Sequence, residues 1–341
     1  MHRKSKIPPN SSPLCRYSLD NQEKKIIEKD RTEVKNILSG KDKRKILIVG
    51  PCSAWPMDAT LIYANRLKNI QNQVEKKLKI VMRVYVQKSR TSVGWTGPFF
   101  QPDPFKAADI NRGVFFTRKL MKLIIKIGIP IATEILFPNT ATYFSEYVTF
   151  GVIGARSSEN PEHRLFASCA NFPIGLKNGR DGNVTNAINS VYVAQQPGTL
   201  YLDRQEINTK GNPYAHLILR GSISGQNYDK KTINNATKLM NKLHIKHPAL
   251  IIDASHDNCL VKGKKKFLQQ INVVKEMIQY MRINKKHNIK GLMIESFLKA
   301  GSQDVAELSK KTVDRGGLSI TDPCLSFEDT EKLIYKLAYE L

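Results

Sequence analysis

The feature that most constrains the fold is a series of eight short apolar runs rich in β-branched residues. The runs start at positions 45, 80, 129, 151, 173, 216, 249 and 291, and they read KILIVG, IVMRVYV, IPIAT, GVIGA, PIGLK, HLILRG, ALIIDAS and GLMIES. Continuously apolar strands that are separated by helix-length segments are typical of parallel pairing through βαβ crossovers. The sequence therefore predicts an α/β fold.

The number of runs indicates how the sheet is arranged. Eight βα units in about 300 residues fall within the size range of a (β/α)8 TIM barrel. Residues 1–44 are polar, with a helical charge pattern from Asn21 to Leu38. We therefore predict an N-terminal arm over 1–44 and a barrel over 45–341, with a doubly wound open sheet as the alternative.

The position of the reactive residues favours the barrel. Nearly every run ends in, or is followed by, a residue that can carry chemistry, and barrel enzymes build their sites at the C-terminal ends of many strands. In chain order these residues are Cys52, Arg83, Lys88, Glu134, Arg156, Lys177, Arg220, His256, Glu295 and Asp322.

Composition narrows the class of protein. The 54 Lys and Arg residues outnumber the 30 Asp and Glu residues, which gives a formal charge of +24 and suits phosphate-bearing partners. No nucleic-acid-binding motif accompanies this charge. The five cysteines are widely spaced and odd in number, and no segment has the apolar length of a membrane span, so we expect a cytoplasmic protein with reduced thiols.

Four of the strand-end residues form a mixed set of metal ligands. Thiolate, imidazole and carboxylate together suit a divalent ion such as manganese, iron, cobalt or zinc, and the ligand types alone do not identify it. Taken singly, each residue also has a structural interpretation, as a packing cysteine, a hydrogen-bonded histidine or a helix-capping carboxylate. The four are Cys52, His256, Glu295 and Asp322.

Six cations accompany them at the strand ends. Lys and Arg are costly at the ends of buried strands unless they pair with anions, so they predict a substrate with more than one anionic group. The alternative is an internal ion-pair network with Glu134 and Asp253. The six are Arg83, Lys88, Arg90, Arg156, Lys177 and Arg220.

The blocks around these residues resemble the type I 3-deoxy-D-arabino-heptulosonate 7-phosphate (DAHP) synthases. They are IVGPCS, MRVYVQKSRTSVGWTG, GARSSENPEHR, PIGLKNGRDG, ILRG, IDASHDN, MIES and SITDPCLSFEDT. The resemblance implies entry to the shikimate pathway: phosphoenolpyruvate condenses with erythrose 4-phosphate, water attacks C2, and phosphate leaves by C–O cleavage.

The resemblance also implies roles for individual residues. A divalent metal would be bound by Cys52, His256, Glu295 and Asp322, and Lys88, Cys52 and His256 would take part in catalysis. Phosphoenolpyruvate would contact Arg83, Arg156, Lys177 and Arg220, and the aldose phosphate would contact Lys88, Arg90 and Thr91. Glu134 and Ala155 would complete the substrate site. A homo-oligomer, dimeric or tetrameric, is expected.

Three departures from the family pattern lie close to these blocks. Trp55 and Phe297 stand where the family has histidine, and Ser89 stands where it has proline. We expect them to reshape the aldose pocket. Two alternatives to erythrose 4-phosphate condensation follow, namely an enzyme for another aldose phosphate and a catalytically silent barrel that binds phosphorylated metabolites.

Overall fold

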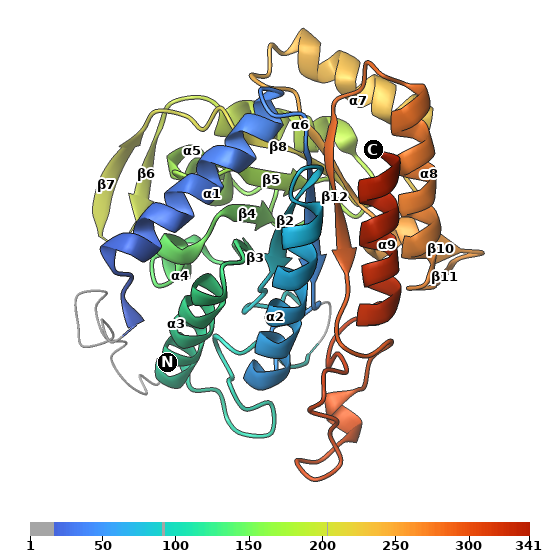
Figure 1. Cartoon of the computed structure of the whole chain (residues 1–341). Helices are drawn as coiled ribbons and strands as arrows, with labels where there is room; N and C mark the ends of the chain where they lie inside the picture. Colours follow the sequence, from blue (N-terminus) through green and yellow to red (C-terminus); the bar gives the residue numbers. More distant parts are fainter. Residues whose placement is uncertain (1–16, 91–92, 203) are drawn as a thin grey trace.

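Eight parallel strands close into a barrel in the computed structural model, which describes residues 17–90, 93–202 and 204–341 (Figure 1). Strand β1 pairs with β12 to close the ring, with Ile46 opposite Gly291. The predicted barrel is confirmed, and the open-sheet alternative is wrong. The barrel strands are β1 (Lys45–Gly50), β2 (Leu78–Arg83), β3 (Ile131–Glu134), β4 (Phe150–Ile153), β5 (Ile174–Lys177), β8 (Ala215–Leu219), β9 (Leu250–Asp253) and β12 (Ile289–Glu295).

Helices alternate with the strands, and two small hairpins interrupt the alternation. The hairpins, which the sequence did not predict, pair β6 (Gly198–Leu202) with β7 (Gln205–Thr209) and β10 (Leu260–Val261) with β11 (Lys264–Lys265). The helices are α1 (Asn21–Ser39), α2 (Met57–Val74), α3 (Ile110–Ile127), α4 (Pro138–Ala141), α5 (Pro161–Cys169), α6 (Val184–Ala194), α7 (Lys230–Lys242), α8 (Gln269–Ile283) and α9 (Phe327–Glu340).

The strands are buried on both faces, which explains why they read as continuous apolar runs. In β1, Leu47 and Val49 belong to the large cluster that also contains Leu67 of α2. Ile46 and Ile48 belong to a separate cluster of inward-facing residues. Alternate residues of a strand point to opposite faces, so one set packs against the helices and the other fills the barrel.

Helix α1 is part of this inner packing. Its start is fixed by a capping box in which Asp20 and Glu23 exchange hydrogen bonds with each other's backbone amides. Val34, Ile37 and Leu38 are buried in the same cluster as the inward-facing strand residues. The polar character of this segment therefore hides an apolar face that docks on the barrel. The division into an arm at 1–44 and a barrel at 45–341 stays a prediction.

The direction of the strands decides where a site can form. All eight barrel strands are parallel, so their C-terminal ends meet at one mouth, at the bottom of the view in Figure 1. The N-terminal ends of the strands meet at the opposite end. None of the described helices combines the length and the apolar character needed to span a bilayer.

Candidate functional site

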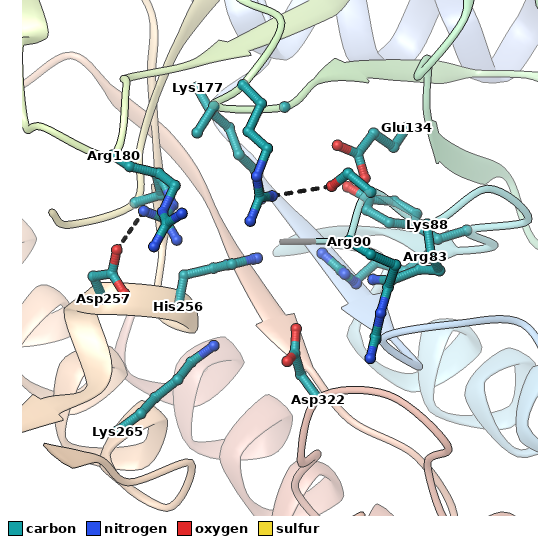
Figure 2. Close-up of a pocket in the computed structure, with 16 residues that line it drawn as sticks. Arg83, Lys88, Arg90, Glu134, Lys177, Arg180, His256, Asp257, Lys265 and Asp322 are labelled. Carbon is teal, nitrogen blue, oxygen red and sulfur yellow. Dashed lines mark hydrogen bonds and ion pairs between the residues drawn. The ribbon is translucent and has the colours of Figure 1, made fainter. Parts of the chain in front are cut away.

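The mouth of the barrel contains a pocket of about 300 Å³ (Figure 2). The structure brings together the six cations singled out in the sequence, along with Glu134, Ala155, His256 and Asp322. Thr91 lies outside the described residues. The lining is completed by residues that were not nominated as ligands or binding groups: Tyr85, Ser89, Gly154, Arg180, Asp257 and Lys265.

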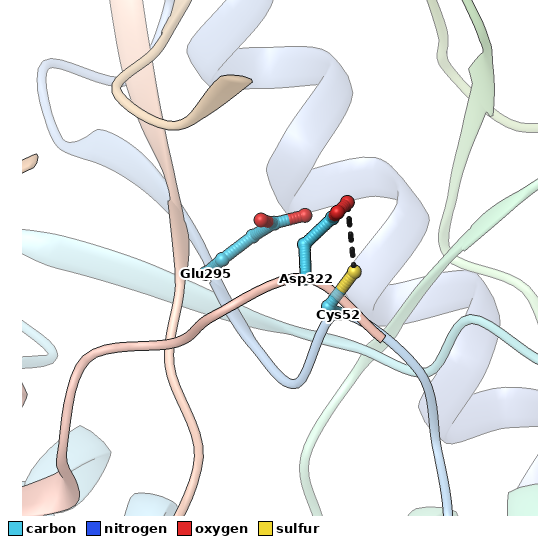
Figure 3. A group of neighbouring side chains, drawn as sticks. All are labelled: Cys52, Glu295 and Asp322. Carbon is cyan, nitrogen blue, oxygen red and sulfur yellow. Dashed lines mark hydrogen bonds between the residues drawn. The ribbon is translucent and has the colours of Figure 1, made fainter. Parts of the chain in front are cut away.

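Three of the four expected metal ligands converge beside this pocket (Figure 3). Cys52 follows β1, Glu295 ends β12, and Asp322 lies in the loop before α9, yet their ligand atoms all lie within 4.8 Å of one another. The Cys52 thiol donates to Asp322 Oδ2 at 3.4 Å. Cys52 and Glu295 are buried and Asp322 is half-buried, and a soft thiolate with two hard carboxylates fits a divalent transition metal.

His256, the fourth expected ligand, lies next to this group but outside it. Its Nε2 is 3.8 Å from Glu295 Oε1, and its Nδ1 is 2.9 Å from Asp253 Oδ2. Burial lowers the pKa of His256, so the imidazole is neutral at pH 7. A neutral ring whose far nitrogen is held by a carboxylate is the form in which histidine binds metals.

Lys88 lines the pocket and also contacts Cys52, one of the expected metal ligands. Its ammonium donates to the carbonyl oxygen of Cys52 at 2.9 Å and to Cys52 Sγ at 3.0 Å. Burial raises the pKa of the Cys52 thiol to about 12, with Glu295 adding to the effect. Although burial opposes the charge of Lys88, Cys52, Asp322 and Glu295 raise its pKa. Lys88 therefore carries a proton at neutral pH.

Arg83 is fully buried, and its guanidinium is only partly satisfied. Nη2 donates to Glu295 Oε1 at 2.9 Å, and the guanidinium lies 4.0 Å from the centroid of the Tyr85 ring. Within the described part of the chain, Arg83 Nε and Nη1 and the Tyr85 hydroxyl have no hydrogen-bond partner. Buried donors without partners are costly, and an anion in the pocket would satisfy them.

Two further cations are held by carboxylates. Lys177 donates to Asp253 Oδ2 at 2.7 Å, and Arg220 pairs with Asp257 at 2.5 Å. Burial lowers the pKa of Lys177 against the opposing effect of Asp253. The alternative of an internal ion-pair network is thus partly correct, because Lys177 does pair with Asp253 as that interpretation expected.

The network does not neutralise the pocket. Its lining contains eight Lys and Arg side chains and three carboxylates, from Glu134, Asp257 and Asp322. Lys88 and Lys265 hold the pKa of Asp322 below its usual value despite burial. The excess of donors over acceptors suits a substrate with several anionic oxygens, such as a phosphate together with a carboxylate.

Two of these cations, Arg180 and Lys265, were not predicted from the sequence. Arg180 comes three residues after the end of β5, within the block PIGLKNGRDG, so its position after a strand could have indicated it. Lys265 belongs to the run KGKKKF, which resembles a solvated surface segment. The β10–β11 hairpin brings it to the pocket, and no local signal distinguishes it from its neighbours.

Glu134 shows why the residue after β4 is glycine. A Cβ at Gly154 would lie 2.1 Å from Glu134 Oε1. Any larger residue at position 154 would push this carboxylate out of the wall of the pocket. The Gly154–Ala155–Arg156 turn therefore allows Glu134 to face the same space as Arg156.

Trp55, Ser89 and Phe297 were expected to reshape the aldose pocket. This expectation is wrong for Trp55 and Phe297. Trp55 and Phe297 are buried and do not line the pocket as described. Trp55 donates its indole N–H to Pro102 O at 3.2 Å and packs edge-on against Trp95, whereas Phe297 packs on Tyr63. Only Ser89 lines the pocket, and its hydroxyl accepts a hydrogen bond from Arg156 at 3.1 Å.

Comparisons with known proteins agree with this geometry. The DAHP synthetase I family matches residues 19–334. The Trp-sensitive phospho-2-dehydro-3-deoxyheptonate aldolase of Escherichia coli K12 is 38% identical over 314 residues, which cover 90% of this chain and 87% of the relative. A phospho-2-dehydro-3-deoxyheptonate aldolase of Corynebacterium glutamicum is 34% identical over 342 residues, which cover 97% of this chain and 91% of the relative. A solved phospho-2-dehydro-3-deoxyheptonate aldolase from Francisella tularensis SCHU S4 superposes with a TM-score of 0.93 at 34% identity, covering 100% and 98%.

Proposed function

The chain belongs to the DAHP synthetase I family and is a DAHP synthase, and we propose that it condenses phosphoenolpyruvate with erythrose 4-phosphate in the pocket at the barrel mouth. One observation carries the assignment of the site. Within the residues that the structure describes, Arg83 has buried donors without hydrogen-bond partners, and they lie among an excess of cations directly beside the Cys52, Glu295 and Asp322 group.

The cations would bind and orient phosphoenolpyruvate. Arg156, Lys177 and Arg220 come from the ends of three different strands, so together they can hold a phosphate and a carboxylate at fixed separation. Arg83 would add its Nε and Nη1 donors, which have no partner among the described residues. We assign the aldose phosphate to Arg90, Thr91 and the neighbouring Ser89.

The family depends on a divalent metal, and the donor set fits one. Cys52, Glu295 and Asp322 would hold it, with His256 as the fourth ligand. When bound, such an ion acts as a Lewis acid toward the aldehyde oxygen. The identity of the ion is left open between manganese, iron, cobalt and zinc.

The remaining chemistry falls to the side chains of the chain itself. As C3 of phosphoenolpyruvate bonds to the aldehyde carbon, the aldehyde oxygen gains charge and needs a proton. Lys88 Nζ lies 3.0 Å from Cys52 Sγ and carries its proton at neutral pH, so we assign it this role. Water then adds at C2, and phosphate leaves toward the cluster of cations.

The structure favours erythrose 4-phosphate over another aldose. Two of the three departures that suggested an altered acceptor lie outside the pocket, which leaves Ser89 alone to affect it. The test is phosphate release from phosphoenolpyruvate with a panel of aldose phosphates. Preference for erythrose 4-phosphate supports the proposal. Preference for another aldose contradicts it, and so does the absence of turnover with any aldose phosphate in the presence of added metal.

We further propose that the protein forms a homo-oligomer.

A further inference from the structure

A second cationic cavity lies at the opposite end of the barrel, where the strands begin. It has a volume of about 190 Å³ and is lined by Gly40, Asp42, Lys43, Arg44, Lys45, Lys285, His287 and Lys290. These residues come from the end of α1, the start of β1, the end of α8 and the start of β12, whose positions can be followed at the top of Figure 1. The pocket at the mouth shares none of them.

The wall of this cavity contains many hydrogen-bond donors and few acceptors. Lys45 Nζ donates to the carbonyl oxygen of Ile289 at 2.9 Å, and neither Lys45 nor Lys290 pairs with a carboxylate in the described part of the chain. The single carboxylate, Asp42, is already 2.7 Å from the Arg44 guanidinium. His287 accepts the amide of Ile289 at Nδ1, so its Nε2 carries a hydrogen and is a further donor.

The cations also act on one another. Burial lowers the pKa of Lys45 to about 8, and Lys290 adds to the effect. Burial, with Lys45 and Lys290, lowers the pKa of His287 to about 4. Two half-buried ammonium groups thus share a small cavity at a cost to stability, and an anion between them would remove that cost.

We propose that this cavity binds a phosphate or diphosphate group of a small molecule. Lys45 and Lys290 are half-buried, and such recessed lysines suit a compact anion with several oxygens. A nucleic acid backbone is instead contacted by cations exposed along a surface. An adjoining cavity of about 570 Å³ shares six of the lining residues and adds Lys76, Lys77, Met281, Arg282, Glu340 and Leu341. It leaves room for the rest of a larger phosphorylated ligand.

The test uses inorganic pyrophosphate as the probe and calorimetry as the readout. The variant is Lys45→Met with Lys290→Met, and the matched control is Lys230→Met with Lys231→Met, which removes the same charge from the exposed start of α7. Titrations are run with excess phosphoenolpyruvate to fill the mouth. We expect the variant to bind pyrophosphate at least about tenfold more weakly than the wild type, and the control to stay within about twofold.

The melting temperature and kcat/KM for phosphoenolpyruvate show whether the variant folds correctly. The variant removes mutual repulsion, so it should melt no lower than the wild type, and kcat/KM for phosphoenolpyruvate should be unchanged because neither lysine lines the mouth. With phosphoenolpyruvate in excess, as in the titrations, pyrophosphate should further raise the melting temperature of the wild type and the control but not of the variant. Equal binding by all three proteins, or complete displacement of pyrophosphate by phosphoenolpyruvate, overturns the proposal. Binding of a single-stranded RNA 20-mer without binding of pyrophosphate overturns it in favour of nucleic acid.

Discussion

Cations gather at both ends of the barrel, but the buried lysines at the two ends differ in whether acidic groups lie beside them. At the mouth, Arg83 and Arg220 each pair with a carboxylate, and nearby acidic groups raise the pKa of Lys88. At the other end Arg44 pairs with Asp42, but Lys45 has no carboxylate partner in the described ranges and burial lowers its pKa to about 8. Net charge alone therefore does not distinguish a catalytic cluster from a simple anion site. The difference lies in the carboxylates of the mouth, which pair with Arg83, Lys177 and Arg220.

The largest expected effect is the loss of metal from the mouth. A chelator in excess should abolish phosphate release, and a divalent transition metal should restore it, because two carboxylates and a thiol converge there. Cys52→Ser should weaken metal binding, since a hydroxyl is a poor substitute for a thiolate. Full turnover in chelator, with no metal found by elemental analysis, would contradict the assignment of these ligands.

The second prediction compares cations at the two ends directly. Arg156→Ala, Lys177→Ala and Arg220→Ala should each reduce kcat/KM for phosphoenolpyruvate by more than about tenfold, because a charge-assisted contact to a desolvated anion contributes about 1.5 to 3 kcal/mol. Lys290→Ala, at the opposite end, is the control and should change it by less than about twofold. Near-normal kinetics in all three folded mouth variants would assign these residues to a structural network.

The third prediction tests whether Phe297 belongs to the aldose site or only to the packed interior. Phe297 is fully buried against Tyr63, so Phe297→His should lower the free energy of unfolding by about 2 to 4 kcal/mol through lost packing and a buried polar ring. The preference among aldose phosphates should not move. Ser89→Pro, inside the pocket, is the comparison and should alter the KM for the aldose with little loss of stability. A changed preference in Phe297→His alone would place that residue in the acceptor site.

The smallest expected effect is on stability at the opposite end. Because the folded pKa of Lys45 is below its unfolded value of 10.5, the unfolded chain binds more protons between pH 8 and 10.5, and this group makes the protein more stable as the pH rises through that window. Lys45→Met removes the effect. In urea unfolding, the variant should therefore exceed the wild type most at pH 7 and least near pH 10.5. If the difference in the free energy of unfolding between the variant and the wild type did not depend on pH, the pKa of Lys45 would not be lowered in the folded protein.

The site was predictable where chemistry follows directly from a strand end. Glu134, Lys177 and Glu295 are the last residues of their strands, and the apolar run before each fixed its position. Arg83 also ends its strand, although the predicted run IVMRVYV continues to Val86. The same reasoning failed for Trp55, which turns away to pack on Trp95. Its environment is made by residues up to about position 320, and no local pattern encodes such a contact.

By itself the sequence determined the barrel and the chemical character of its mouth, because apolar periodicity is a local property and parallel strands bring all their C-terminal ends to one side. Tertiary structure alone decided which cations are neutralised. Lys177 and Asp253 lie on separate strands, and Lys265 reaches the mouth on a hairpin. Closure of the ring also brought Lys45 next to Lys290, far along the chain, and so made the cavity at the other end. Charges interact through space, so their pairing follows the closed fold and not the order of residues.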